Sequence, residues 1–495
     1  MSTDIPKGDF MGHPKGLWML FSSEFWERFS YYGMRAMLAV HVASTFFAHL
    51  GDKADAQASL TYGGYTAMVY MTGIMGGYVA DKIIGYQRSI MLGGALMGAG
   101  MFMLMAPDLT TFLIGLAVIV VGNGLFKPNI SSMVGKLYSP TDVRRDAGFT
   151  IFYMGINAGA LIAPLVCATI IGQMYGYRWG FFTAGIGMIF GIVVFQLLKG
   201  WLGHVGTAPK EKKGFASMIQ VLVGAAILVV PVYFLLSKSE VLGVILIFMM
   251  IGLVAFFVWS GLQSGEKEQL HKYIAMLILF SANILFWALF EQAGSSLNFL
   301  ARDYVNMPEV TIFGWQPTFE IFQSVNPIFI LFLAPVFAGM WPALEKKGFN
   351  PSIPRKFAFG LVGVAVGFYI LVFAIQSMAA DNGKISWIWL ALCYMIHTMG
   401  ELCLSPIGLS MVTKLARPHE VGLAMGGWFL SIAMANYVAG IIASVASGGS
   451  AHGTAASAIN QYSDVFGQLF WLGLGAAALF FIAAPFINKL MHGVK

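Results

Sequence analysis

Seven ionisable side chains lie inside long apolar stretches of this chain, where charges are costly. They are Glu24, Glu27, Arg28, Arg35, Lys127, Glu291 and Glu401. One ionised group at the centre of a membrane helix costs about 2.5 to 3.5 kcal/mol on insertion scales, and the sum exceeds what a typical fold can offset. These groups must therefore pair with one another, reach water, or both. Opposite charges held in this way could bind a zwitterion and carry a proton.

Polar residues of the stretch 17–48 recur at helical spacing. They are Glu24, Glu27, Arg28, Tyr31, Tyr32 and Arg35. Residues three, four or seven positions apart share one face of a helix. Alternating charges and tyrosines make poor lipid contacts, so this face is expected to line a cavity. The alternative, structural ion pairs or side chains that reach out from helix ends, fits less well because the charges lie well inside their stretches.

The elements that would position these groups are membrane-spanning helices. Of the 495 residues, 58% are hydrophobic and only 11% are charged, against roughly 25% charged in soluble domains. Apolar stretches of about 20 residues, long enough to cross a bilayer, recur along the chain. Fourteen helices are expected, at 17–48, 58–80, 89–106, 110–135, 147–173, 179–198, 216–236, 240–262, 273–300, 319–343, 357–379, 386–413, 420–446 and 464–488.

Other features of the sequence fit a membrane protein without a cleaved leader or disulfides. Residues 1–16 are polar and lack the pattern of a signal peptide, so the first apolar stretch is expected to remain as a helix. Cys167, Cys393 and Cys403 lie in apolar stretches and are expected to be small buried side chains. The net charge of +6 comes from short loops between spans, which indicates membrane topology rather than a nucleic-acid partner.

The charged stretches recur in two halves of the chain. Residues 216–236 and 241–262 contain no charge and are expected to be a lipid-facing insertion. Without them, the seven charges fall on the first, fourth, seventh and tenth helices, which are equivalent members of two six-helix halves. Transporters built from repeated halves bind substrate at the midplane between them. We therefore predict an all-α integral membrane protein with an N-terminal six-helix bundle (1–200), a linker with two extra transmembrane helices (201–265) and a C-terminal six-helix bundle (266–495).

Three motifs resemble those of known transporters. The segment 77–88, GYVADKIIGYQR, resembles the loop signature of the major facilitator superfamily. The segment 24–33, EFWERFSYYG, is similar to the E-x-x-E-R-x-x-Y-Y signature of the proton-dependent oligopeptide transporter family, and 152–159, FYMGINAG, resembles that family's second signature. The likeness covers the whole chain, including two inserted helices usual in bacterial members. It implies the major facilitator fold with 14 transmembrane helices.

The resemblance also implies roles for individual residues. Arg28 and Lys127 would bind the carboxylate of a peptide, and Glu401 its amino group, with Asn157 and Asn326 helping. Side-chain pockets would be lined by Tyr31, Tyr32, Tyr70, Trp287 and Trp428. Proton coupling would involve Glu24, Glu27, Arg28, Arg35 and Glu291. Animal relatives use a histidine on the second helix, but residues 58–80 contain none, so carboxylates must carry the proton here.

The charges themselves agree with these roles. A short peptide is a zwitterion whose termini lie roughly 5 to 11 Å apart. Four carboxylates against three bases leave one acid without a fixed partner, a candidate proton carrier. Opposite charges on equivalent helices also predict two gating pairs, Arg35 with Glu291 and Lys127 with Glu401, each formed in one orientation of the carrier and parted in another.

The expected function is therefore a proton-coupled symporter that imports di- and tripeptides by alternating access, without a cofactor and as a monomer in the bacterial inner membrane. The nearest alternative is another small substrate on the same scaffold, such as nitrate or a modified amino acid. A membrane enzyme is not expected, because the sequence has no H-E-x-x-H, no G-x-x-x-x-G-K-[ST] and no Cys/His cluster at metal-ligand spacing.

The distribution of basic residues predicts the orientation in the membrane. If both termini are cytoplasmic, 21 Lys and Arg lie in cytoplasmic segments, five lie on the other side and three lie within spans. A reporter placed after Lys212 or at the C-terminus should therefore be cytoplasmic, and one placed between Gly448 and Gly453 should be outside. A C-terminal reporter found outside would remove one helix from the expected fourteen.

Overall fold

The computed structural model describes residues 8–139, 141–208, 214–310, 316–380, 382–448 and 455–494. These residues form fourteen long helical segments, and eleven of them are long and apolar enough to cross a membrane. The other three are α1 (Lys15–Thr45), α2 (Ala54–Met71) with α3 (Gly73–Val79), and α4 (Tyr86–Met103), which correspond to the predicted spans 17–48, 58–80 and 89–106. The predicted all-helical membrane fold is confirmed.

The remaining eleven segments correspond to the other predicted spans. They are α5 (Leu109–Lys136), α6 (Arg145–Ala163) with η3 (Pro164–Gly172) and α7 (Gln173–Tyr175), α8 (Tyr177–Leu198) with η4 (Lys199–Leu202), α9 (Phe215–Ser237), α10 (Ser239–Gln263), α11 (Lys267–Phe290) with η6 (Glu291–Gly294) and α12 (Ser296–Tyr304), η7 (Phe319–Ser324) with α13 (Val325–Lys346), α14 (Ile353–Ser377), α15 (Trp387–Leu415), α16 (Val421–Ser447) and α17 (Ala455–Leu490). Short elements connect them: η1 (Ala48–Lys53), η2 (Ala80–Ile84), the antiparallel pair β1 (Asp9–Phe10) and β2 (His13–Pro14), and the parallel pair β3 (Val305–Asn306) and β4 (Ile385–Ser386).

Local sequence explains several helix boundaries. Asp108 caps α5 by accepting a hydrogen bond from the backbone N–H of Thr111 at 2.8 Å. Gly85 separates η2 from α4 with φ of 79°, a left-handed conformation that favours glycine. A side chain at Gly85 would also collide with the backbone of Ala208. The turn between the second and third spans therefore depends on this glycine of the loop signature.

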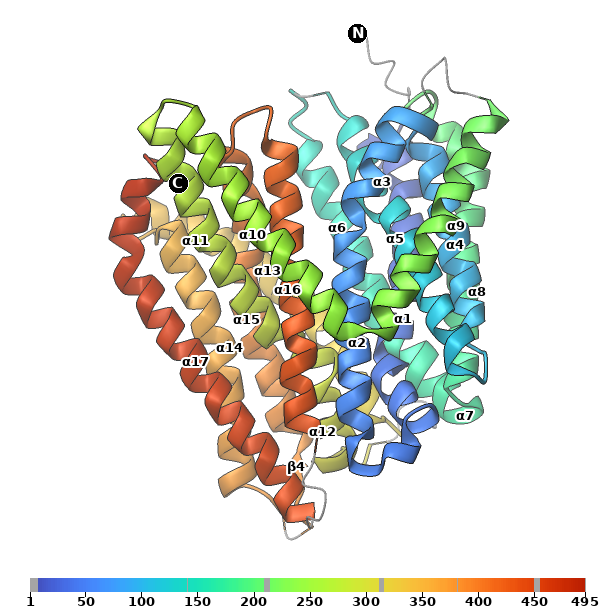
Figure 1. Cartoon of the computed structure of the whole chain (residues 1–495), viewed down its shortest axis with the longest axis vertical. Helices are drawn as coiled ribbons and strands as arrows, with labels where there is room; N and C mark the ends of the chain where they lie inside the picture. Colours follow the sequence, from blue (N-terminus) through green and yellow to red (C-terminus); the bar gives the residue numbers. More distant parts are fainter. Residues whose placement is uncertain are drawn as a thin grey trace. The chain divides into compact units, whose positions relative to one another are not determined.

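The chain divides into two compact units. One contains Met1–His41 and Met68–Lys238, and the other contains Val42–Ala67 and Ser239–Lys495. In the first unit α9 packs against α5 and η2, whereas in the second α10 packs against α11 and α16. Within the second unit α14 and α17 run side by side (Figure 1). The two inserted helices thus belong to different units, and the predicted domain limits at 200 and 265 stay a prediction.

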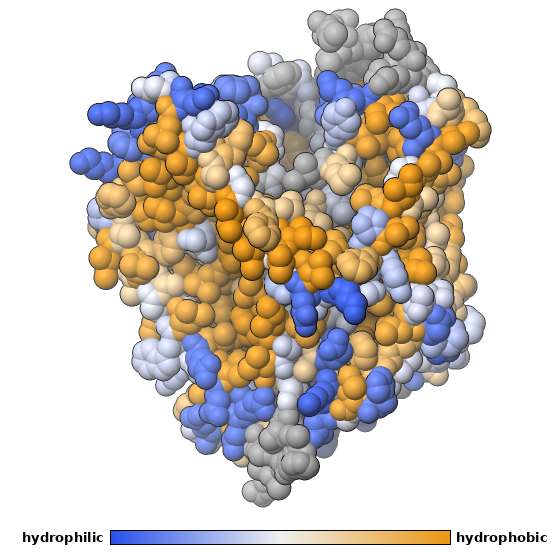
Figure 2. Space-filling model, in the orientation of Figure 1, coloured by the Kyte–Doolittle hydropathy of each residue, from blue (hydrophilic) through white to orange (hydrophobic). Residues whose placement is uncertain are grey.

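The surface of α9 and α10 is apolar. Figure 2 shows hydrophobic residues over much of the surface that these two helices form. Large side chains such as Ile227 and Phe248 are 66% and 68% exposed. A helix of a soluble protein would not expose so many large apolar side chains, whereas a helix in contact with lipid does so without cost. The surface agrees with a lipid-facing insertion.

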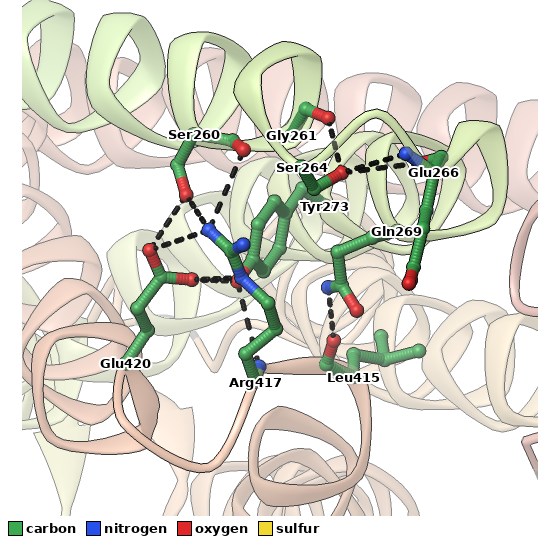
Figure 3. Close-up of polar contacts among 9 residues, drawn as sticks. All are labelled: Ser260, Gly261, Ser264, Glu266, Gln269, Tyr273, Leu415, Arg417 and Glu420. Carbon is green, nitrogen blue, oxygen red and sulfur yellow. Dashed lines mark hydrogen bonds and ion pairs between the residues drawn. The ribbon is translucent and has the colours of Figure 1, made fainter.

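A polar cluster at the end of α10 ties it to the second unit (Figure 3). Glu420, which precedes α16, accepts hydrogen bonds from Ser260 of α10 at 2.6 Å and from Arg417 at 2.9 Å. The hydroxyl of Tyr273 in α11 also donates to this carboxylate. Burial raises the pKa of Glu420, but the hydrogen bonds from Arg417, Ser260 and Tyr273 outweigh it and bring the pKa to about 2.

Replacing Glu420 should destabilise the second unit. Glu420→Gln removes a charge that accepts four hydrogen bonds from three residues, and it should lower the free energy of unfolding by about 1 to 3 kcal/mol. Because the pKa of Glu420 is lowered from 4.5 to about 2, this stabilisation is complete above about pH 4.5 and is lost as the pH falls toward 2. Thermal unfolding in detergent at pH 7 measures the difference. Glu268→Gln is the control, because Glu268 pairs with Lys272 with its side chain 55% exposed and should change stability little. Equal losses of stability in the two variants would show that the buried cluster stabilises the protein no more than an exposed ion pair does.

Candidate functional site

The three charged residues of the first signature form a buried cluster on α1. Arg28 Nε lies 2.9 Å from Glu24 Oε1, and Arg28 also pairs with Glu27. The side chains of all three residues are at most 4% exposed. Asn123 of α5 donates a hydrogen bond to Glu27 at 3.4 Å. These charges pair as expected, whereas the contact of Asn123 with Glu27 was not predicted.

Two glycines of the second signature bring α6 against α1. A side chain at Gly159 would collide with the carbonyl oxygen of Phe25 and come within 2.9 Å of Arg28 Cβ. A side chain at Gly155 would lie 2.8 Å from the Phe21 ring. Real Cβ atoms essentially never approach other atoms so closely, and small residues commonly allow membrane helices to pack in this way. The two signatures are therefore two sides of one helix contact, which sets the position of Arg28.

Arg28 keeps one donor available. Its buried Nη2 has no hydrogen-bond partner among the described residues. The guanidinium carbon also lies 5.6 Å from the centre of the Tyr31 ring, within the range of a cation–π contact. A buried guanidinium donor without a partner is costly, and a carboxylate oxygen is the acceptor that suits it best.

Lys127 lies on the same unit, next to a proline in α5. Its Nζ is 4.6 Å from the centre of the Tyr70 ring. Pro128 has no N–H to donate within the helix, and the Asn129 side chain donates to the carbonyls of Leu125 at 2.7 Å and Gly76 at 3.1 Å. The helix α5 nevertheless continues through Pro128, and the Asn129 side chain links it to α3.

Two other predicted residues of this unit have local contacts. Arg35 lies over the Tyr32 ring, 5.9 Å from its centre. Asn157 is buried in α6, and its side-chain amide donates to the Tyr153 carbonyl one turn earlier at 2.9 Å. This hydrogen bond uses the side-chain nitrogen of Asn157. The side-chain oxygen is an acceptor that suits a donor of a ligand.

In the second unit, Glu401 and Asn326 are in contact as a pair. The Asn326 amide donates to Glu401 Oε2 at 2.9 Å and to the Thr398 hydroxyl at 2.9 Å. Asn326 and Pro327 lie in the first turn of α13, directly after η7. A proline there removes no hydrogen bond from the helix, because the first N–H groups of a helix have no partner within it. The Asn326 amide orients the Glu401 carboxylate. Pro327, at the start of α13, does not weaken the helix.

The other predicted residues of the second unit lie on α11, η6 and α16. Glu291 begins η6, where α11 ends, and is buried. Trp287 has a buried indole N–H with no hydrogen-bond partner among the described residues. Trp428 is 2% exposed and packs against the rings of Phe280 and Phe357. Trp287 thus retains a donor for a ligand, whereas Trp428 lies within the core of its unit.

A further ion pair in the second unit was not predicted. Arg302 of α12 lies 2.7 Å from both Asp55, in the first turn of α2, and Asp303. Asp55 and Arg302 are 247 positions apart in the chain, and no local pattern in the sequence links them.

The predicted gating pairs join residues of different units. Arg35 and Lys127 belong to the first unit, and Glu291 and Glu401 to the second. Both pairings stay predictions. Within the described part of the chain, no three or more His, Cys, Asp or Glu side chains are grouped so that they could hold a metal ion.

The fold and the buried charges define a secondary transporter of the major facilitator type. The chain belongs to the POT family of proton-dependent oligopeptide transporters, whose model matches residues 87–464. It is a family of transporters, not of enzymes. The resemblance read from the signatures is confirmed.

Relatives match almost the whole chain. A peptide transporter from Yersinia enterocolitica, YePEPT, is 36% identical over 89% of this chain and 90% of its own. A di-/tripeptide transporter from Lactococcus lactis is 38% identical over 85% of this chain and 87% of its own. The crystal structure of a peptide transporter POT in complex with sulfate is 37% identical, with a TM-score of 0.82 and coverage of 99% of this chain and 98% of that one.

The buried cluster on α1 predicts that the effects of its charges on the free energy of unfolding depend on one another. Arg28→Met leaves two buried carboxylates without their cation and should lower the free energy of unfolding by about 3 to 5 kcal/mol. Adding Glu24→Gln and Glu27→Gln removes these charges and should restore most of the loss. Thermal unfolding of the single and triple variants in detergent measures both effects. A triple variant no more stable than Arg28→Met would mean that packing of the arginine stem, rather than charge balance, causes the loss.

Proposed function

We propose that this protein is a proton-coupled symporter that imports di- and tripeptides by alternating access. The observation that carries the proposal is the buried Arg28, held between Glu24 and Glu27, with one guanidinium donor left without a hydrogen-bond partner among the described residues. Membership of the POT family and the peptide-transporting relatives support the same conclusion.

The first unit holds the groups suited to a peptide carboxylate. Arg28 and Lys127 are cations whose nearest aromatic neighbours, Tyr31 and Tyr70, keep them beside an apolar surface. A carboxylate bound by a guanidinium and an ammonium gains charge-assisted hydrogen bonds to both. Tyr31, Tyr32 and Tyr70 are then the natural contacts of the first side chains of the peptide.

The second unit holds the groups suited to the amino terminus. Glu401 is an acceptor for an ammonium group, and its hydrogen bond from Asn326 at 2.9 Å fixes the direction of the carboxylate. Asn157 of the first unit could accept a further hydrogen bond from the peptide. The unpartnered indole N–H of Trp287 supplies a donor for a peptide carbonyl.

Glu24 and Glu27 couple the proton to the peptide. While either carboxylate is ionised, it pairs with Arg28 and competes with the substrate. Protonation of one carboxylate frees the guanidinium for the peptide. Proton and peptide thereby favour the same state, and each raises the affinity for the other by the same factor. Two ion pairs act as gates, Arg35 with Glu291 and Lys127 with Glu401. Each pair forms in one orientation of the carrier and parts in another.

The proposal extends to location and assembly. The excess of basic residues in alternate loops supports cytoplasmic termini in a bacterial inner membrane. One chain contains the groups for both ends of the substrate, so a monomer is sufficient for transport.

The test is uptake of a labelled dipeptide into proteoliposomes, with and without an inward proton gradient. The wild-type protein should accumulate the dipeptide only with the gradient, and unlabelled di- and tripeptides should compete, whereas nitrate and single modified amino acids should not. Glu27→Gln mimics the protonated carboxylate, so it should keep peptide exchange in counterflow but lose gradient-driven accumulation. Arg28→Ala should weaken both activities.

Two outcomes would contradict this mechanism. Full gradient-driven accumulation by Glu27→Gln would mean that the proton travels through other groups, with Glu291 the first to examine. Competition by nitrate or a modified amino acid, but not by peptides, would keep the fold and overturn the substrate.

A further inference from the structure

A cavity of about 400 Å³ opens between α9 and the neighbouring α3 and α5 of the first unit. Its walls come from residues 72–83, 121–125 and 220–231. Apart from Thr72 and Gln220, all lining residues are apolar or glycine. Its volume is in the range of small-molecule sites, roughly 300 to 1,000 Å³. No part of the peptide-binding machinery described above lines it.

The cavity lies at hydrocarbon depth. Residues 121–125 are the middle of α5, which spans Leu109–Lys136. The facing helix α9 has no charged residue and is largely exposed, as expected of a helix in contact with lipid. An apolar cavity that opens toward hydrocarbon is filled by hydrocarbon, because neither water nor a vacuum is favourable there.

One polar side chain of the cavity lacks a partner. Thr72 is satisfied, since its hydroxyl donates to the carbonyls of Met68 at 3.2 Å and Val120 at 3.1 Å. The Gln220 side chain, by contrast, forms no hydrogen bond with any residue that the structure describes. An amide on a lipid-facing helix costs free energy unless a molecule from outside the protein supplies an acceptor.

Gln220 lies toward the end of the cavity that is nearer the membrane surface. It is in the second turn of α9, about 8 Å from the helix start at 1.5 Å per residue. Val221, its neighbour, packs with Ile84 and Leu125, and Ile84 is adjacent to the turn at Gly85. The cavity therefore runs from the border of the hydrocarbon layer toward its centre. The border is where the ester carbonyls of glycerophospholipids lie.

We propose that the cavity is a binding site for a glycerophospholipid of the bilayer. One acyl chain fills the apolar part, and an ester carbonyl accepts a hydrogen bond from the Gln220 amide. The lipid thereby completes the packing between α9 and the pair of α3 and α5. The proposal does not depend on which substrate the protein transports.

The structure supplies a pair of matched variants. Gly224 lines the cavity, and a Cβ added there meets no atom within 4 Å. Gly252 on α10 is also exposed and equally unobstructed, but it does not line the cavity. Gly224→Leu should therefore fill the cavity without strain, and Gly252→Leu controls for adding the same side chain to a lipid-facing helix. Gln220→Leu removes only the amide.

The test uses full-length protein in vesicles of phosphatidylethanolamine and phosphatidylglycerol with a small fraction of a phospholipid that carries a diazirine on one acyl chain. After irradiation, mass spectrometry maps the adducts. We expect adducts in residues 220–231 and 72–83 of the wild-type protein and of Gly252→Leu, and their loss in Gly224→Leu. Gln220→Leu should reduce them about two- to tenfold, as expected for one net hydrogen bond.

Three outcomes would overturn the proposal. The first is an adduct pattern that Gly224→Leu leaves unchanged, which would mean that labelling reports general lipid contact. The second is full labelling of Gln220→Leu, which would remove the ester contact and leave only nonspecific filling. The third is displacement of the labelled lipid by an equal amount of oleic acid, or cross-links between two copies of the chain at these residues.

Discussion

The cost of holding ionised groups in hydrocarbon shapes the rest of this structure. Glu24, Glu27 and Arg28 are buried side by side on one helix, and none of them could remain ionised there alone. Their mutual pairing lets a long charged helix exist inside a membrane protein. Because two acids share one cation, the cluster also has more than one way of balancing its charge. The coupling proposed above depends on that surplus of negative charge, because one acid can bind a proton while the other still balances Arg28.

Close helix packing makes this cluster precise in position. Gly155 and Gly159 let α6 approach α1 at the turn that carries Arg28, and the side chain of Asn123 approaches from α5 to contact Glu27. The helix α6 therefore packs against the stem of Arg28, and the Asn123 amide contacts the Glu27 carboxylate that pairs with it. Such packing limits the conformations of the cluster before any ligand binds.

Sequence reasoning reached the helices and the buried charges because both leave local signals. The predicted stretch 216–236 differs from α9 (Phe215–Ser237) by one residue at each end. The predicted start of the last helix, 464, was wrong, since the helix begins at Ala455. Residues 455–463 consist largely of Ala and polar residues and form helix without being strongly apolar. The pair of Asp55 with Arg302 and the contact of Asn123 with Glu27 were missed, since pairing across such separations is decided by packing. The roles expected of Trp287 and Trp428 came from the family resemblance, and the structure gives the two side chains different surroundings. The indole N–H of Trp287 has no hydrogen-bond partner among the described residues, whereas Trp428 packs against aromatic rings.

The carboxylate of Glu420 gives a useful contrast to those of α1. Three donors hold its pKa at about 2, far below the acidity that any living cytoplasm reaches. At any pH well above that value the carboxylate stays ionised and keeps its hydrogen bonds. The charge of Glu420 therefore does not change near neutral pH. The contact of α10 with this cluster is consequently insensitive to pH changes near neutrality, unlike a buried pair in which two acids share one cation.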